Sequence, residues 1–215
     1  MPVVSEDLKG KALLAQRFWL KDEQGETWQF LNVGANHSLY GDMTAELVRI
    51  ALEEGIQEVV FAGSAGAVNP RFPIYSFVLP SQLRDYQGQP QPFHNAWIST
   101  ATAQPLSYAS MALNTHHQGV ISPVAETQDL IRLLQKEAID TVDVEVAEVA
   151  KVMADFPAAH FSVALLVTDY PGAFLQPQQH HLDAVDYRQK YQQLPQLMSL
   201  LMQHYRWQKV VNHGS

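Results

Sequence analysis

Three short segments of the sequence place polar or very small residues at the ends of apolar, strand-like runs. Gly63-Ser64-Ala65-Gly66 follows the apolar run 58–62, Asp143-Val144-Glu145 ends a short run that begins at Thr141, and Thr168-Asp169 follows the apolar run 161–167. In an open α/β sheet, ligands bind beyond the carboxyl ends of the strands. We therefore expect Ser64, Glu145 and Asp169 to lie around one ligand site.

Each segment also has a structural interpretation. Gly63–Gly66 could form a tight turn from a strand to a helix, Glu145 could be an acid stabilised by the dipole of a helix N-terminus, and Asp169 could cap a turn before Pro171-Gly172. Taken singly, each structural interpretation is the more common one. The argument for a site is that three such segments occur at three strand ends.

The elements that must position these residues alternate between strand and helix. A hairpin is predicted over 18–31 and strands over 58–62, 74–80 and 161–167. Helices are predicted from Asp42 to about Gly55, over 126–138 with Thr127 as N-cap, and from Ala147 onward. In the second of these helices Leu130, Leu133 and Leu134 are expected to face inward. Segment 81–95 reads as an exposed loop, and 184–205 as an amphipathic helix interrupted by Pro195. This order predicts one α/β domain over residues 1–215, with three αβα layers and a mostly parallel or mixed central sheet.

Composition and charge exclude several classes of function. The chain of 215 residues has a net charge of −8, no cysteine and no basic run, which argues against nucleic-acid binding, disulfides and a cysteine nucleophile. No apolar stretch reaches the roughly 20 residues that span a bilayer, and the charged N-terminus does not resemble a signal peptide. We expect a cytoplasmic protein with no membrane partner.

The histidines and serines do not predict a metal site or a serine hydrolase. His116-His117 and His180-His181 are adjacent pairs, which a strand points to opposite faces, and neither has the spacing of a helical zinc pair. Gly63-Ser64-Ala65-Gly66 is one residue shorter than the Gly-x-Ser-x-Gly nucleophile elbow. No metal and no cofactor are expected.

Several segments together resemble one family. The sequence from about Leu31 to Asp169 is similar to the superfamily of nucleoside phosphorylases and nucleosidases, which includes the purine and uridine phosphorylases. The segments that resemble it are Phe61-Ala62-Gly63-Ser64-Ala65-Gly66-Ala67-Val68-Asn69-Pro70, Ala125-Glu126-Thr127, Thr141-Val142-Asp143-Val144-Glu145-Val146-Ala147 and Leu165-Leu166-Val167-Thr168-Asp169.

The resemblance implies an activity and a role for each matched residue. Members cleave an N-ribosidic bond, which builds negative charge on the departing base, and by resemblance Asp169 is the acid that neutralises it. Glu145 matches the carboxylate that binds the ribose hydroxyls, Val144 the residue that packs against the nucleoside, and Glu126 a base-binding acid. Gly63 and Ser64 match the segment that holds phosphate or the attacking water. A homo-oligomer is also expected.

The sequence departs from the family pattern where phosphate is normally held. The usual N-terminal strand and helix have no counterpart before the hairpin, so the domain reads as N-terminally shortened. The segment 34–41 resembles a phosphate motif whose arginine is Ala35 here. His37 is therefore a candidate anion or ribose ligand, although an ordinary surface or core histidine is the more common case. Arg71 and Arg84 are the nearest replacements for the arginine.

These departures favour hydrolysis over phosphorolysis of a purine nucleoside or a related nucleoside. The alternative is a catalytically degenerate module that binds a nucleoside-like ligand and is completed by another chain or domain.

Overall fold

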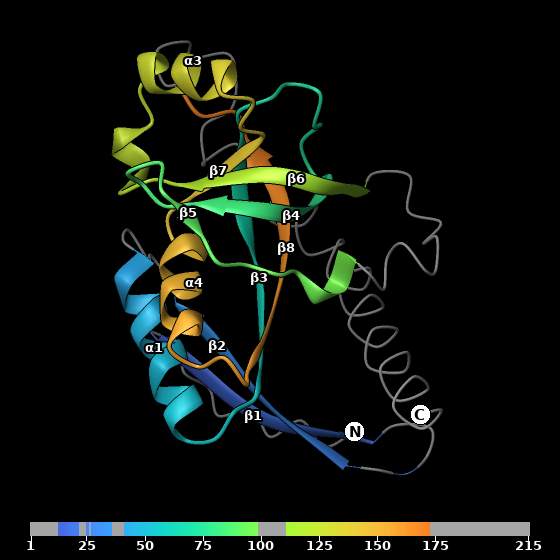
Figure 1. Cartoon of the computed structure of the whole chain (residues 1–215). Coiled ribbons are helices and arrows are strands. Elements are labelled where there is room, and N and C mark those ends of the chain that lie inside the picture. Colours follow the sequence, from blue (N-terminus) through green and yellow to red (C-terminus); the bar gives the residue numbers. More distant parts are fainter. Residues whose placement is uncertain (1–12, 22–24, 26, 36–40, 99–110, 173–215) are drawn as a thin grey trace, which may run out of the picture. The chain divides into compact units, whose positions relative to one another are not determined.

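The computed structural model describes residues 13–21, 25, 27–35, 41–98 and 111–172 (Figure 1). The chain divides into two compact units, residues 1–39 and 40–215, which are described separately. His37, His180-His181 and the helix predicted over 184–205 lie outside the described residues.

The first unit is an antiparallel hairpin. β1 (Leu13–Lys21) pairs with β2 (Thr27–Ala35) in a continuous register from Leu13↔Ala35 to Lys21↔Thr27. Gly25, between the strands, has a φ of 82°, which glycine adopts without steric cost. The hairpin predicted over 18–31 is confirmed, and its strands extend further in both directions.

The second unit is built on a mixed sheet, as predicted. Its strands are β3 (Glu58–Ala67), β4 (Phe77–Arg84), β5 (Pro90–Gln91), β6 (Met111–Gly119), β7 (Thr141–Asp143) and β8 (His160–Asp169), in the order β5-β4-β6-β7-β3-β8. β3 is parallel to β8, and β6 is parallel to both β4 and β7, whereas the β3–β7 and β4–β8 pairs are antiparallel. The additional pairing of β4 with β8 joins the two ends of the series β4-β6-β7-β3-β8, so these strands form a closed ring.

Two helices pack side by side on this sheet. α1 (Gly41–Glu53) and α4 (Val146–Ala154) contact each other along their length (Figure 1). Their buried residues join one apolar cluster with the strands, including Ala45, Leu52, Val146, Val149, Ala150, Val163 and Leu165. Burial of this cluster is the main favourable contribution to this side of the fold.

A third helix, α3 (Gln128–Lys136), begins as predicted at Thr127, whose Oγ1 accepts a hydrogen bond from Leu130 N at 3.3 Å. Its inward face is formed by Ile131 and Leu134, with Leu130 partly buried. The prediction that Leu133 faces inward is wrong, because it is 51% exposed. The spacing of the apolar residues was compatible with burial of either face of α3, and packing against the rest of the fold determined which face is buried.

The prediction of an exposed loop over 81–95 is wrong at its two ends and correct for the exposed turn at 86–89. β4 continues to Arg84, β5 pairs with it, and Asn95 and Trp97 are buried. The Asn95 side-chain amide donates to the carbonyl oxygens of Pro80 at 3.1 Å and Val163 at 2.8 Å. A buried amide with satisfied hydrogen bonds can lie inside a fold, so the polar composition of this segment was misleading.

Candidate functional site

The glycine-rich segment is part of a strand, so the interpretation of Gly63–Gly66 as a tight turn from a strand to a helix is wrong. β3 pairs with β8 from Glu58 to Gly66 and with β7 at Gly66 and Ala67. The glycines leave room for neighbouring rings, because a Cβ on Gly63 would lie 3.0 Å from Phe61 Cζ, and one on Gly66 2.8 Å from Pro171 Cδ. Ser64 is half-buried on this strand, opposite Leu166 of β8.

The ends of β3, β7 and β8 adjoin one another, as do β6 and β7. Gly66 pairs with Asp169 of β8 on one side and with Val142 of β7 on the other, and Gly119 of β6 pairs with Asp143 of β7. The backbone segment before Glu145 and the backbone segment that contains Asp169 therefore both lie beside the end of β3. That the side chains of Ser64, Glu145 and Asp169 share one ligand site stays a prediction.

Asp169 is the last residue of β8 and is 8% exposed. Thr168 Oγ1 donates a hydrogen bond to Asp169 Oδ1 at 3.1 Å. The chain then turns through Pro171, which packs on Gly66, and Gly172, which packs against Ile131 of α3. The acid is thus held at the point where β8, β3 and α3 converge.

Glu126 lies just after the 3₁₀ turn Pro123–Ala125 and is 8% exposed. Burial, together with the nearby negative charges of Asp169 and Asp143, raises the pKa of this carboxyl from 4.5 to about 8. Glu126 is therefore mainly protonated at pH 7 and can donate a hydrogen bond as well as accept one. Glu126 was predicted as a base-binding acid only by resemblance, and its burial was not predicted.

Asp143 and His117 are the residues of this region that sequence reasoning missed. His117 is completely buried on β6, with Nε2 2.9 Å from Asp143 Oδ1 and Nδ1 3.0 Å from Thr141 Oγ1. An available signal was the position of Asp143 two residues before Glu145. No local pattern indicates the pairing of Asp143 with His117, which lies 26 residues earlier.

Val144 and Glu145 form the connection between β7 and α4. Val144 is buried in a cluster with Val68, Val120 and Ile131, and Glu145 is half-buried at the N-terminus of α4. The first turn of α4 is capped by Asp143, whose carboxylate oxygens lie 3.1 and 3.3 Å from Val146 N.

The first residue of α1 lies against this connection. A Cβ added to Gly41 would overlap the carbonyl oxygen of Val144, and would lie 2.9 Å from its carbonyl carbon and 3.0 Å from Glu145 Cα. Backbone atoms cannot move aside as a flexible side chain can. Glycine is therefore required here by close approach, and α1 fixes the backbone that precedes Glu145.

We expect Gly41→Ala to lower the free energy of unfolding by about 1–3 kcal/mol, the usual cost of inserting a methyl group into a packed region. Chemical denaturation measures the change. Met43→Ala, at an exposed position of the same turn, is the control and should change stability by well under 1 kcal/mol. Equal stability of the two variants would contradict the close packing of α1 on Val144.

The two arginines proposed as phosphate ligands both have carboxylate partners. Arg71 Nη2 lies 3.0 Å from Asp140 Oδ1, and its guanidinium stacks on the ring of Phe72. Arg84 Nη1 lies 2.7 Å from Glu137 Oε2. The other arginines of the ranges 41–98 and 111–172, Arg49 and Arg132, also pair with acids.

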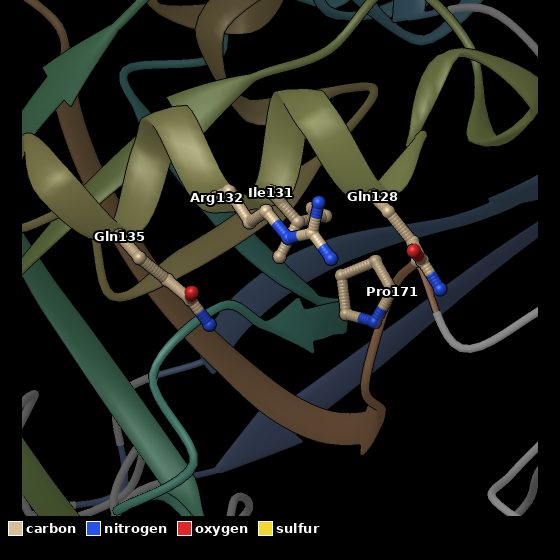
Figure 2. A pocket seen from close by; sticks show the side chains of 6 residues that line it. Gln128, Ile131, Arg132, Gln135 and Pro171 are labelled. Carbon is tan, nitrogen blue, oxygen red and sulfur yellow. The ribbon is translucent and has the colours of Figure 1, made fainter.

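A hollow of about 200 Å³ lies on the surface between α3 and the turn after β8, lined by Gln128, Ile131, Arg132, Gln135, Pro171 and Gly172 (Figure 2). The hollow is open to solvent, and Ser64, Glu145 and Asp169 do not line it. Among the described residues, no three histidines and acids cluster as metal ligands do, and no helix has the length and apolarity needed to cross a membrane.

Comparison with known proteins connects this arrangement to one family. A family model described as "Phosphorylase superfamily" matches residues 41–200. A search of curated protein sequences found no match.

The fold is similar to several solved structures. A methylthioadenosine phosphorylase from an antarctic soil metagenomic library has a TM-score of 0.64 at 13% identity, covering 92% of this chain and 81% of that one. A Schistosoma mansoni purine nucleoside phosphorylase in complex with inosine has a TM-score of 0.68 at 12% identity, covering 89% and 76%. A methylthioadenosine phosphorylase from the same organism in complex with adenine has a TM-score of 0.64 at 10% identity, covering 90% and 86%. At such identities the likeness concerns the fold.

Proposed function

The chain belongs to the phosphorylase superfamily, and on that premise we propose that it cleaves the N-ribosidic bond of a purine nucleoside or a related nucleoside. The observation that carries the proposal is the group of buried acids Glu126, Asp143 and Asp169, which interact electrostatically where β7 and β8 end. Burial of several carboxyl groups together costs free energy, and without a ligand to bind this cost would bring no functional benefit. A carboxyl group such as Glu126, whose pKa is raised by burial and by neighbouring charges, is typical of functional sites.

The acids have complementary roles in the proposed reaction. Breaking the bond places negative charge on the departing base and positive charge on the sugar. Asp169 protonates the base, a contribution typically worth about 10²–10⁴-fold in rate. Glu126, which keeps its proton at neutral pH, donates a hydrogen bond to the base and accepts one beside it. Glu145 accepts hydrogen bonds from the ribose hydroxyls, and Val144 packs against the nucleoside.

We further propose that water, rather than phosphate, is the attacking group, positioned by Ser64 and the backbone near Gly63. The ion pairs of Arg71 and Arg84 support this choice, because phosphorolysis needs a cationic clamp for a dianion. The side chain of Asp140, which binds Arg71, is only 7% exposed, so releasing that arginine would leave a buried carboxylate without its ion pair. The net charge of −8 also does not attract phosphate.

The test is incubation with inosine, adenosine and methylthioadenosine, with and without phosphate, followed by chromatography of the products. These nucleosides are chosen because the similar structures are named as purine nucleoside and methylthioadenosine phosphorylases. We expect free base together with the free sugar in phosphate-free buffer. Strict phosphate dependence, with a sugar 1-phosphate as product, would contradict hydrolysis but would still support cleavage of the N-ribosidic bond.

The same panel distinguishes an enzyme from a module that binds without turnover. Calorimetric binding of a nucleoside with no released base would support the binding module. Neither binding nor release for any nucleoside would contradict the proposed function as a whole. Assembly as a homo-oligomer and a cytoplasmic location stay predictions.

A further inference from the structure

His117 is a buried histidine to which the proposed chemistry assigns no role. The ring is completely buried between two polar residues of the neighbouring strand, with Thr141 at Nδ1 and Asp143 at Nε2. An ionised carboxylate only accepts hydrogen bonds, so Nε2 carries the proton that is donated to Asp143, and Nδ1 can accept the hydroxyl proton of Thr141. Both ring nitrogens are therefore used inside the protein.

Asp143 connects His117 to the backbone at the start of α4. Its Oδ1 accepts from His117, and both carboxylate oxygens lie within 3.3 Å of Val146 N in the first turn of α4. Val144 and Glu145 are the only residues between Asp143 and Val146 in the chain. Asp143 begins the connection that includes Glu145, and its carboxylate also binds the amide at the end of that connection. The hydrogen bond from His117 of β6 fixes the orientation of this carboxylate.

We infer that His117 is a positioning residue, which acts through Asp143 to hold the Val144–Glu145 connection in the conformation that binds the sugar of the ligand. The identity of the ligand rests on the proposed function, whereas the brace between His117, Asp143 and Val146 depends only on this chain. His117 touches neither the sugar nor the base in this proposal.

The charged and titratable groups around Asp143 agree with this role. They are His117 from β6, Glu145 from the connection before α4, Glu126 from the segment before α3 and Asp169 from β8. His117 donates a hydrogen bond to the carboxylate of Asp143, whereas the negative charges of Asp143 and Asp169 raise the pKa of Glu126. The hydrogen bond from His117 keeps the carboxylate of Asp143 oriented toward Val146 in spite of these acids.

Two substitutions of His117 separate the contact with Asp143 from simple burial. In His117→Gln the side-chain amide can reach the place of Nε2 and donate to Asp143, whereas the shorter amide of His117→Asn reaches only the place of Nδ1, beside Thr141. Both variants remain polar and of similar size. His116→Asn is the matched control, because His116 is the adjacent residue and its side chain points away from Asp143 on the strand.

The first measurement is hydrogen exchange of the Val146 amide, which needs no ligand. We expect exchange to be at least about tenfold faster in His117→Asn than in the wild type, since a lost hydrogen bond to a charged group changes local opening by roughly that factor. His117→Gln should restore slow exchange, and His116→Asn should not alter it. Equal exchange in His117→Asn and His117→Gln would overturn the inference, whether or not the protein cleaves nucleosides.

The second measurement links the brace to the ligand. In His117→Asn we expect KM for the cleaved nucleoside to rise by about tenfold, with the Kd for free adenine or hypoxanthine unchanged, because the base does not contact Glu145. Equal weakening of base and nucleoside would overturn the role in sugar binding. If the wild type binds no nucleoside, the proposed function fails, and the exchange of Val146 still decides whether His117 positions the connection.

Discussion

Asp169→Asn is expected to lower kcat for nucleoside cleavage by about 10²–10⁴-fold, the usual value of a general acid. An amide has nearly the shape of the acid but does not protonate the departing base. The hydrogen bond from Thr168 Oγ1 at 3.1 Å can be retained by the amide oxygen, so the end of β8 should keep its conformation. Steady-state kinetics with the nucleoside cleaved best by the wild type measures the change.

The control for this variant is Asp129→Asn, whose side chain is 95% exposed in the first turn of α3 and should leave kcat unchanged. Circular dichroism and thermal unfolding establish that Asp169→Asn is folded. Because the charge of Asp169 raises the pKa of Glu126, the variant should also lower that pKa toward its ordinary range. A kcat equal to that of the wild type, in a folded variant, would exclude Asp169 as the acid.

Glu126→Gln is expected to remove a pH dependence of stability that the wild type has between about pH 4.5 and pH 8. The pKa of Glu126 is raised from 4.5 to about 8 in the folded protein, so within this interval the folded state holds a proton that the unfolded state has lost. The stability that the protonated acid contributes is fully present below pH 4.5 and is lost as the pH rises through 8. Glutamine stays neutral at every pH.

The expected difference is on the order of a few kcal/mol, since one pKa unit corresponds to about 1.4 kcal/mol. Chemical denaturation at several pH values from 4.5 to 8.5 measures it for the wild type and the variant. Glu53→Gln, an exposed position at the end of α1, is the matched control and should follow the wild-type curve. Parallel curves for the wild type and Glu126→Gln would show that the acid is not buried as described.

Local patterns in the sequence were sufficient to predict most of the elements and the place where they converge. The apolar, β-branched run of β8, the Thr127 cap of α3 and the turn residues of the hairpin act over a few neighbouring residues, so they can be read without knowing the fold. The convergence of the segments that precede Glu145 and include Asp169 could be predicted because ligand sites in α/β sheets lie at strand ends.

The tertiary structure alone decided what these residues contact. Gly63–Gly66 remains in a strand because β8 and β7 pair with it and because Phe61 and Pro171 fill the space beside the glycines. These partners are distant in sequence, or lie beside the glycines only once β3 is extended. A turn and a strand were therefore equally compatible with the local sequence.

The chemical state of the site was likewise decided by contacts between distant segments. The protonation of Glu126 depends on its burial and on the charges of Asp169 and Asp143, and the orientation of Asp143 depends on His117. Pairing β6 with β7 brings His117 beside Asp143, and the separation of these residues in the chain gives no sign of it. The sequence determined which acids are present, whereas packing determined which of them keeps its proton, because desolvation and neighbouring charge exist only in the folded chain.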